Sequence, residues 1–374
     1  KTLAVAAVGA NSPIVGLLLN FFIGIALGVN VVIAKAVGKN NNRTIHKAVH
    51  TSIIMAVVGG FAVTVIGELF IGELLQVLNV PDDVFPYALL YIRIYLIGMP
   101  VILLYNFEAA IFRSIGETKT PLKALAFSGV VNVLLNLFFV IVLKMTVNGV
   151  AIATVISNAL SSVILFIKLM KTDSVIHVDV KSLRFDKNVF IRIIKIGLPA
   201  GVQSAVFSVA NIVIQSAINS LGTVVIAASS AAFNIEIFAY DILNSFSQAC
   251  TTFVGQNYGA GQLKRCRKTL FLCLIEDAVA TAAAIGIVLL SGRFLLSIFN
   301  NDPAVIDLGY VRLVTIFFAY IFSMLYEVMS GYLRGFGISL TPAILTTLGV
   351  CGVRIVWIAA VFPKSRTFET IMTA

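Results

Sequence analysis

The chain repeats the nonapeptide Arg113-Ser-Ile-Gly-Glu-Thr-Lys-Thr-Pro121, which returns 221 positions later as Arg334-Gly-Phe-Gly-Ile-Ser-Leu-Thr-Pro342. Arg, Gly, Thr and Pro occupy the same four places in both copies. Each copy lies at the basic end of a long apolar segment. The repeated unit is therefore a group of membrane helices, and the chain is built from two related halves.

Two further motifs recur in the same order along the chain. Val37-Gly-Lys-Asn40 is matched by Val254-Gly-Gln-Asn257, and Tyr91-Ile-Arg93 is matched by Tyr310-Val-Arg312. Their offsets of 217 and 219 residues are close to the 221 of the nonapeptide, as expected from duplication followed by small insertions. Because both copies place the same helix ends on the same side, we expect parallel repeats related by an axis along the membrane normal.

The composition requires lipid as a solvent. Of the 374 residues, 59% are hydrophobic and 12% are charged, and the mean hydropathy is +1.01. Soluble domains carry about 25% charged residues. Apolar stretches longer than the roughly 20 residues that cross a bilayer recur along the whole chain. The predicted fold class is an all-α polytopic membrane protein with two pseudo-symmetric helical bundles.

Charge clusters and Pro, Gly and Asn residues divide the apolar sequence into ten predicted helices, with bounds uncertain by about four residues. The helices cover 12–36, 46–75, 86–113, 121–143, 147–171, 190–219, 222–254, 268–292, 305–333 and 342–363. Several are longer than a bilayer requires, so they must tilt, kink or project beyond the hydrocarbon. Pro100 and Pro199 are the predicted kink sites.

The two halves do not contain the same five helices. The helix at 190–219 has no counterpart before Lys1, and the helix at 147–171 has none after Ala374. We therefore expect twelve helices in the whole protein, of which this chain lacks the first and the last. The predicted domains are an N-terminal lobe at 1–171, a polar cytoplasmic linker at 172–189 and a C-terminal lobe at 190–374.

The distribution of basic residues predicts the orientation of the helices. The net charge is +10, and 19 of the 27 Lys and Arg residues lie at one alternating set of helix ends. By the positive-inside rule these ends are cytoplasmic. The opposite ends hold Lys144, Arg293 and little else before the tail, where Lys364 and Arg366 run mildly against the assignment. The charge is thus explained by membrane topology, and no nucleic-acid partner is expected.

Several kinds of chemistry are not supported by any motif. The four cysteines show no paired spacing for a disulfide or a zinc site, and His46 and His50 lack a third ligand. The stretch from Gly255 to Gly261 has no Lys-Ser/Thr after it, so it is not a phosphate-binding loop. We therefore expect no metal, no cofactor and no ATP-driven pump, and any energy must come from an ion gradient.

Acidic residues within the apolar helices are the main candidates for function. A charged side chain in a span costs about 2.5–3.5 kcal/mol on insertion scales, so each one requires an explanation. Glu236 and Asp241 lie near the middle of the helix at 222–254, and Glu327 lies one turn from Ser323 on the same face. All three acids could bind the coupling ion or a cationic substrate. The alternative is a structural pair with a side chain of another helix. Glu108, nearer a helix end, is expected to snorkel, and Glu276 and Asp277 are ambiguous.

Two helices carry polar faces of amide side chains. Asn132 and Asn136 are four residues apart and so share a face, which favours an interhelical hydrogen bond or a place in the wall of the first-lobe cavity. Gln203, Asn211 and Gln215 follow at spacings of eight and four residues. This stripe is a candidate lining for a central cleft.

The motifs resemble those of the multidrug and toxic compound extrusion (MATE) transporters. The stretch from Leu104 to Leu122 is similar to the fourth-helix signature of that family, and Val254-Gly-Gln-Asn-Tyr-Gly-Ala-Gly261 is similar to its loop after the eighth helix. Asn132-Val-Leu-Leu-Asn136 and Gly149-Val-Ala-Ile-Ala-Thr-Val-Ile-Ser157 resemble the fifth and sixth helices. The resemblance covers the chain as family helices two to eleven and is strongest to bacterial members.

The resemblance implies an antiporter that exports cationic or amphipathic organic compounds in exchange for Na⁺ or H⁺ by alternating access. It further implies a monomer in the bacterial inner membrane, in contact with lipid. The second-lobe cation site of other members is altered, because Phe207 and Ser323 stand where those members carry acids. In the fifth helix, which belongs to the first lobe, Asn136 stands where Asp is frequent. Ser323 shares a helix face with Glu327 and remains a candidate.

Two rival functions are weighed against export. A lipid-linked oligosaccharide flippase would share the two-lobed design, but its cleft should be strongly cationic, whereas the acids dominate here. An integral membrane enzyme would need a metal cluster or a nucleophile motif, and the sequence contains neither. The predicted class is therefore a transporter rather than an enzyme.

Overall fold

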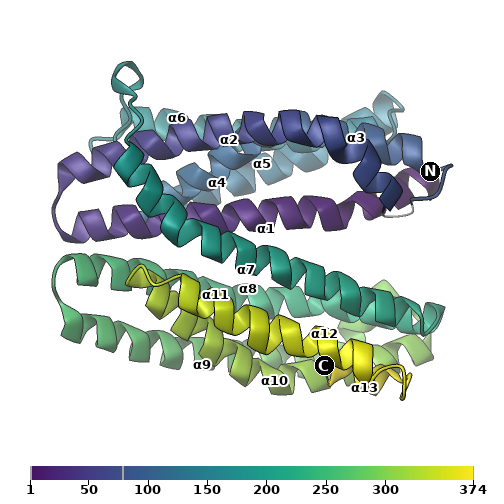
Figure 1. Ribbon diagram of the computed structural model, residues 1–374. Helices are drawn as coiled ribbons and strands as arrows, with labels where there is room; N and C mark the ends of the chain where they lie inside the picture. Colours follow the sequence, from purple (N-terminus) through teal and green to yellow (C-terminus); the bar gives the residue numbers. More distant parts are fainter. Residues whose placement is uncertain (1, 78–79, 374) are drawn as a thin grey trace. The chain divides into compact units, whose positions relative to one another are not determined.

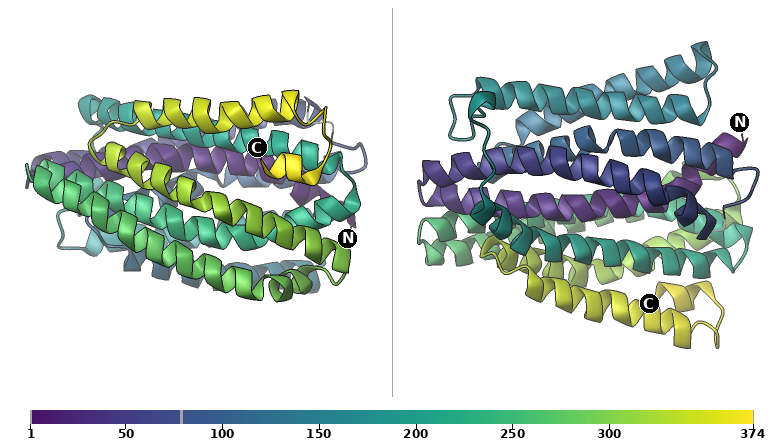
Figure 2. Two further views of the ribbon diagram at one scale, coloured as in Figure 1. Left: turned by 90° about the horizontal axis from the view of Figure 1, so that it is seen from below. Right: turned by 45° about the horizontal axis from the view of Figure 1, so that its top comes forward.

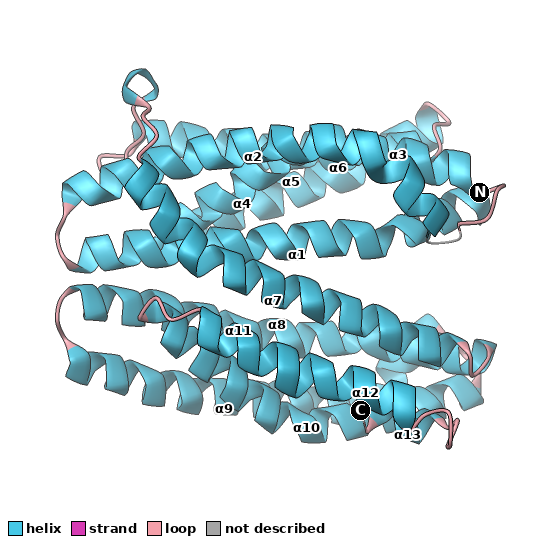
Figure 3. Ribbon diagram, viewed as in Figure 1, coloured by secondary structure: helices cyan, strands magenta, loops and turns pink. Residues whose placement is uncertain are grey.

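The computed structural model describes residues 2–77 and 80–373. In this part of the chain every regular element is a helix, and loops join them (Figure 3). Nine helices are long and apolar enough to cross a membrane, and the bent pair α3–α4 makes a tenth among the described residues. This arrangement confirms the predicted all-α fold class.

The chain forms two compact units, Lys1–Gly201 and Val202–Ala374. The first contains α1 (Thr2–Gly38), α2 (Asn42–Val77), α3 (Phe85–Ile97), α4 (Met99–Ser114), α5 (Lys119–Leu137) and α6 (Val147–Lys171). The second contains α8 (Thr223–Gly259), α9 (Leu263–Phe299), α10 (Pro303–Gly335), α11 (Leu340–Thr346), α12 (Val353–Ala360) and α13 (Phe368–Met372). The boundary between the units falls inside α7 (Lys187–Asn219), whereas the sequence repeat assigns all of that helix to the second lobe.

The repeated nonapeptide forms the same helix end in both units. Gly116 and Gly337 have φ values of +84° and +78°, a conformation that only glycine adopts without strain. In each copy the glycine N–H bonds back to the repeated arginine, over 2.9 Å to the Arg113 carbonyl and 2.7 Å to the Arg334 carbonyl. The glycine thus ends one span, and the Thr-Pro pair begins the next.

Pro100 kinks its span as predicted, because α3 and α4 meet at an angle of 50° across Gly98. Proline has no N–H, so the helix bond to the Leu96 carbonyl is lost. The Thr64 hydroxyl of α2 donates to that carbonyl over 2.6 Å instead. Gly60 allows this approach, since an added Cβ would lie 2.3 Å from the Pro100 Cα. At Pro199, by contrast, α7 continues without a break.

The first unit is built around α1, α2, α4 and α6. Its largest buried cluster joins these helices to the start of α7 through fully buried side chains such as Ile33, Ile45 and Leu165. α5 packs beside α6 on the outside (Figures 1 and 2). α1 and α7 cross closely, because added Cβ atoms at Gly24 and Gly197 would lie 2.4 Å and 2.6 Å from backbone atoms of the other helix.

In the second unit α8 and α10 run in the same direction in close contact. Gly331 permits the approach, since an added Cβ would lie 2.4 Å from the Ser247 carbonyl oxygen. The Ser247 hydroxyl donates to the Glu327 carbonyl over 2.8 Å, and the Thr251 hydroxyl donates to the Gly331 carbonyl over 3.0 Å. The four-residue steps on both helices keep one face of α8 against one face of α10. This seam positions the charged residues of the unit.

Candidate functional site

The strongest charge contact within the seam joins Glu236 of α8 to Arg312 of α10. Arg312 Nε lies 2.7 Å from Glu236 Oε1, and Arg312 Nη2 lies 2.9 Å from Glu236 Oε2. The remaining amino group, Nη1, donates to the Ser229 hydroxyl over 2.6 Å. Ser229 and Glu236 are seven residues apart, so two helical turns place them on one face. The bidentate geometry is that of a strong structural ion pair.

Glu327 of α10 has a different environment, although its side chain is also buried. Its Oε1 accepts hydrogen bonds from the Tyr326 hydroxyl over 2.9 Å and the Tyr240 hydroxyl over 3.2 Å. No cationic side chain lies within 4 Å of this carboxylate among the described residues. Glu327 is therefore a buried acid held by neutral donors, with Oε2 left for another partner.

Asp277 of α9 is a second buried acid in this unit. It is 0% exposed, and its Oδ1 accepts a hydrogen bond from the Thr281 hydroxyl over 2.8 Å. Its Oδ2 is buried and has no hydrogen-bond partner. Sequence reasoning left Asp277 ambiguous because its span begins only nine residues earlier at 268. Packing of Cys273, one turn before it, against Val328 of α10 turns this face of α9 inward.

The other acid and hydroxyl candidates lie outside these contacts. Asp241 is exposed, and its backbone carbonyl accepts from the Ser245 hydroxyl over 2.7 Å. Ser323 is half-buried, one turn before Glu327. The predicted acids therefore do not form one site, since Glu236 is paired, Glu327 is held by tyrosines and Asp241 is exposed.

The polar stripe of α7 contacts two arginines. Gln203 Oε1 accepts from Arg334 Nη2 over 2.8 Å, which connects the repeated arginine to α7. Asn211 Oδ1 accepts from Arg354 Nη1 of α12 over 3.3 Å. Arg354 was missed in the sequence, although a basic residue within an apolar helix carries the same insertion cost as an acid.

In the first unit the amide candidates form a seam between α5 and α6. Asn132 Nδ2 donates to the Ser157 hydroxyl over 3.1 Å, and Asn136 Nδ2 donates to Asn132 Oδ1 over 3.0 Å. The bond from Asn132 to Ser157 is the interhelical hydrogen bond that was one of the two alternatives for this face of α5. Glu108 corrects an expectation, because it is 0% exposed and does not snorkel, and its Oε2 accepts from the Ser162 hydroxyl over 3.0 Å.

The polar linker after α6 is attached to the first turns of α2. Lys47 Nζ lies 2.6 Å from Asp186 Oδ2, and the His50 ring contacts the Ser182 carbonyl over 3.1 Å and the Asp179 N–H over 3.4 Å. The hydrogen bond from Lys47 lowers the pKa of Asp186, and the hydrogen bond from the Lys181 N–H lowers the pKa of Asp179. The linker is thus a docked segment.

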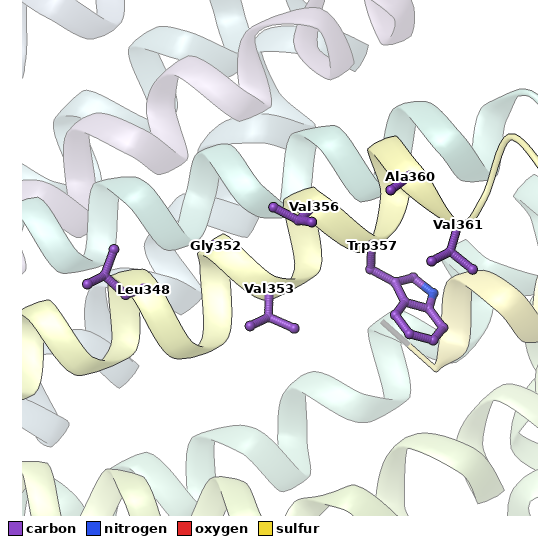
Figure 4. A pocket seen from close by; sticks show the side chains of 7 residues that line it. All are labelled: Leu348, Gly352, Val353, Val356, Trp357, Ala360 and Val361. Carbon is purple, nitrogen blue, oxygen red and sulfur yellow. The ribbon is translucent and has the colours of Figure 1, made fainter.

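The surface hollow of about 420 Å³ on α12 does not resemble a polar binding site. It is lined only by apolar residues and glycine: Leu348, Gly352, Val353, Val356, Trp357, Ala360 and Val361 (Figure 4). Within residues 2–77 and 80–373 no three His, Cys, Asp or Glu side chains gather as metal ligands.

Comparison with known proteins explains the repeated halves. The family model described as MatE matches two stretches of the chain, residues 1–138 and 199–359. The chain belongs to the MatE family. MatE proteins are transporters and not enzymes, so this chain is a multi-pass membrane transporter of that family.

Curated relatives of this MatE chain come from bacteria. The probable multidrug resistance protein YoeA of Bacillus subtilis is 25% identical over 359 residues, which are 94% of this chain and 78% of YoeA. The multidrug export protein MepA of Staphylococcus haemolyticus is 23% identical, over 82% of this chain and 67% of MepA. The FAD transporter of Shewanella oneidensis is 23% identical, over 82% of this chain and 69% of its own length.

Solved structures show the same fold. A MATE crystal structure in complex with MaL6 superposes with a TM-score of 0.91 at 19% identity, over 98% of this chain and 83% of that chain. A MATE family multidrug resistance transporter in an outward-facing conformation also superposes with a TM-score of 0.91. Its identity is 20%, over 100% of this chain and 84% of that chain. The MatE fold, including the two repeated bundles, is thus established for this chain.

Proposed function

We propose that this MatE chain exports drug-like organic compounds, cationic or amphipathic, by alternating access in exchange for Na⁺ or H⁺. The relatives named as multidrug resistance and multidrug export proteins support the substrate class. The bacterial relatives support a place in the bacterial inner membrane. We further propose that the protein acts as a monomer.

The observation that carries this proposal is the environment of Glu327. Among the described residues this buried carboxylate accepts hydrogen bonds from the hydroxyls of Tyr240 and Tyr326, and no cation lies within 4 Å to offset its desolvation. A proton or Na⁺ would supply the missing positive charge. Binding shifts the conformational equilibrium only if the ion binds one state more tightly than the other, so Glu327 must be reached from different sides in the two states.

Glu236 and Asp241 receive different roles in this proposal. Arg312 already neutralises Glu236, so we assign Glu236 to holding α8 against α10. Asp241, which is exposed, remains a candidate for attracting cationic substrate. The amides of Asn132, Gln203 and Asn211 are engaged in interhelical hydrogen bonds, Asn136 donates to Asn132 within α5, and all four are assigned to the scaffold.

The test is ethidium efflux from proteoliposomes of the full-length protein, with the Na⁺ and H⁺ gradients collapsed separately. Transport should stop when one of the two gradients is removed. Glu327→Gln should abolish the response to that gradient, whereas the exposed Glu73→Gln of α2 should behave as wild type. Efflux that is independent of both gradients would refute the antiport, and gradient-driven efflux by Glu327→Gln would refute the role of Glu327.

A further inference from the structure

Arg354 is a half-buried arginine of α12 that has no counter-ion among the described residues. It lies within the apolar span Leu340–Ala360, and no carboxylate lies within 4 Å of it among the described residues. Of the five N–H donors of a guanidinium, one makes a hydrogen bond, to Asn211 Oδ1 at 3.3 Å. An uncompensated charge of this kind is costly in a span, so it requires a partner.

Arg354 makes its contacts on α7, away from the helix ends. It is six residues from the end of α12, about 9 Å at 1.5 Å per residue. Its partners on α7, Asn211 and Phe207, lie eight and twelve residues from the end of that helix, about 12 and 18 Å. The guanidinium is therefore held by an amide and a ring that lie more than two turns inside α7.

Glu236 of α8 does not supply the missing counter-charge, because both of its oxygens accept from Arg312. The Arg354 guanidinium instead lies over the Phe207 ring, 5.7 Å from its centroid. A cation–π contact fixes the plane of a guanidinium while leaving its edge available for a planar oxyanion.

We propose that Arg354 binds the oxyanion of an amphipathic substrate, a carboxylate, sulfonate or phosphate, while Phe207 packs against its aromatic part. This inference rests on the proposed export function and extends the substrate class from cations to zwitterions and anions. An arginine fork matches an oxyanion through two parallel hydrogen bonds, which a lysine cannot form. Esterifying the acid removes the charge and should remove this recognition.

The test compares rhodamine B, which carries a free carboxylate, with its ethyl ester in proteoliposomes of the full-length protein. Arg354→Gln should lower transport of rhodamine B about tenfold and leave the ester within about twofold of wild type. Arg354→Lys should lower transport of rhodamine B about threefold. The control is Arg293→Gln, an exposed arginine of α9 that pairs with Asp307.

A binding measurement separates a substrate oxyanion from a lipid phosphate. Trp357, the only tryptophan of the chain, is three residues from Arg354, so its fluorescence reports binding in lipid-free detergent. The quenching gives an apparent Kd for rhodamine B. An apparent Kd about tenfold higher in Arg354→Gln than in wild type supports the substrate assignment. Unchanged quenching, together with loss of thermal stabilisation by added phosphatidylglycerol, assigns the site to lipid and overturns the proposal.

The outcomes also separate this inference from the proposed function. Wild-type protein that exports the ester but not rhodamine B refutes the role of Arg354 and leaves drug export intact. An equal loss of both dyes in Arg354→Gln likewise overturns oxyanion recognition. Wild-type protein that exports neither dye nor ethidium refutes the proposed function, and the inference with it.

Discussion

Arg312 and Glu236 form a bidentate ion pair between α10 and α8, whereas the equivalent arginine of the first unit, Arg93, pairs with Glu68 of α2. Arg312 and Arg93 occupy the same place in the repeated Tyr-x-Arg motif. Their side chains are 10% and 50% exposed. Duplication kept the arginine in each half, but the acid that neutralises it comes from a different helix.

Breaking the buried pair should destabilise the second unit strongly. Arg312→Ala should lower the unfolding free energy by about 3–5 kcal/mol, because it leaves Glu236 buried without a counter-charge. Arg93→Ala, at the half-exposed equivalent position, should cost about 0–1 kcal/mol. Denaturant unfolding in detergent measures both. Equal losses at the two positions would contradict the burial argument.

Replacing both partners should be tolerated far better than replacing one. The double variant Glu236→Met and Arg312→Met removes both charges and retains side-chain volume, so its stability should lie closer to wild type than that of either single variant. A double-mutant cycle on unfolding free energies quantifies the coupling. If ion-driven ethidium efflux also survives in this variant, Glu236 has no part in coupling.

The α8–α10 seam should not accept a methyl group at Gly331. Gly331→Ala would place Cβ 2.4 Å from the Ser247 carbonyl oxygen, and such overpacking costs about 1–3 kcal/mol. Gly286→Ala in α9 is the matched control, because nothing lies within 4 Å of its added Cβ. Alanine favours a helix over glycine by about 1 kcal/mol, so the control should be stabilised. A stable Gly331→Ala would show that the helices are not in close contact.

Asp277 should accept a neutral amide. Asp277→Asn retains an oxygen acceptor for the Thr281 hydroxyl and removes a charge from a side chain that is 0% exposed. Its unfolding free energy should stay within about 1 kcal/mol of wild type, and Asp277→Leu should lose more because Thr281 then loses its acceptor. Thermal unfolding with a fluorescent thiol probe would follow both variants. A large loss in Asp277→Asn alone would show that the charged form is required.

Docking of the linker on α2 should weaken in acid. The pKa of Asp186 is lowered from the ordinary 3.8, chiefly by the hydrogen bond from Lys47. The ion pair therefore contributes fully above pH 3.8 and is lost as the pH falls through the lower pKa of the folded protein. The protection of the linker amides, corrected for the intrinsic exchange rate at each pH, should fall over that range. Lys47→Ala should raise the exchange already at neutral pH, and an unchanged rate would refute the docking.

Much of the fold could be predicted because each feature is local. A membrane span is recognised by its length and hydropathy, and the glycine of the Arg-x-x-Gly motif ends its helix. Pro100 bends its helix because it cannot donate a backbone hydrogen bond. The positive-inside rule likewise uses only the order of charges along the chain. The repeat followed from identities at near-constant offsets, and the family followed from the resemblance of local motifs to those of the MATE transporters.

The candidate site could be predicted only as a set of unusual residues. Helical periodicity places Glu236 on a face, but it does not show that Arg312 stands opposite, or that tyrosines reach Glu327. Asp277 was left ambiguous and Arg354 was missed. Distance from a helix end says little about the burial of a side chain once helices cross at an angle.

The sequence by itself determined that this protein is a duplicated membrane protein, since hydrophobicity, turn chemistry and repetition are properties of the chain, and its motifs resemble those of transporters. Only the tertiary structure decided which charges are neutralised. The cost of a buried charge depends on what another helix places within about 4 Å of it, and that is fixed by helix packing. Glu236 thereby became part of the scaffold, and Glu327 and Arg354 remained without counter-charges.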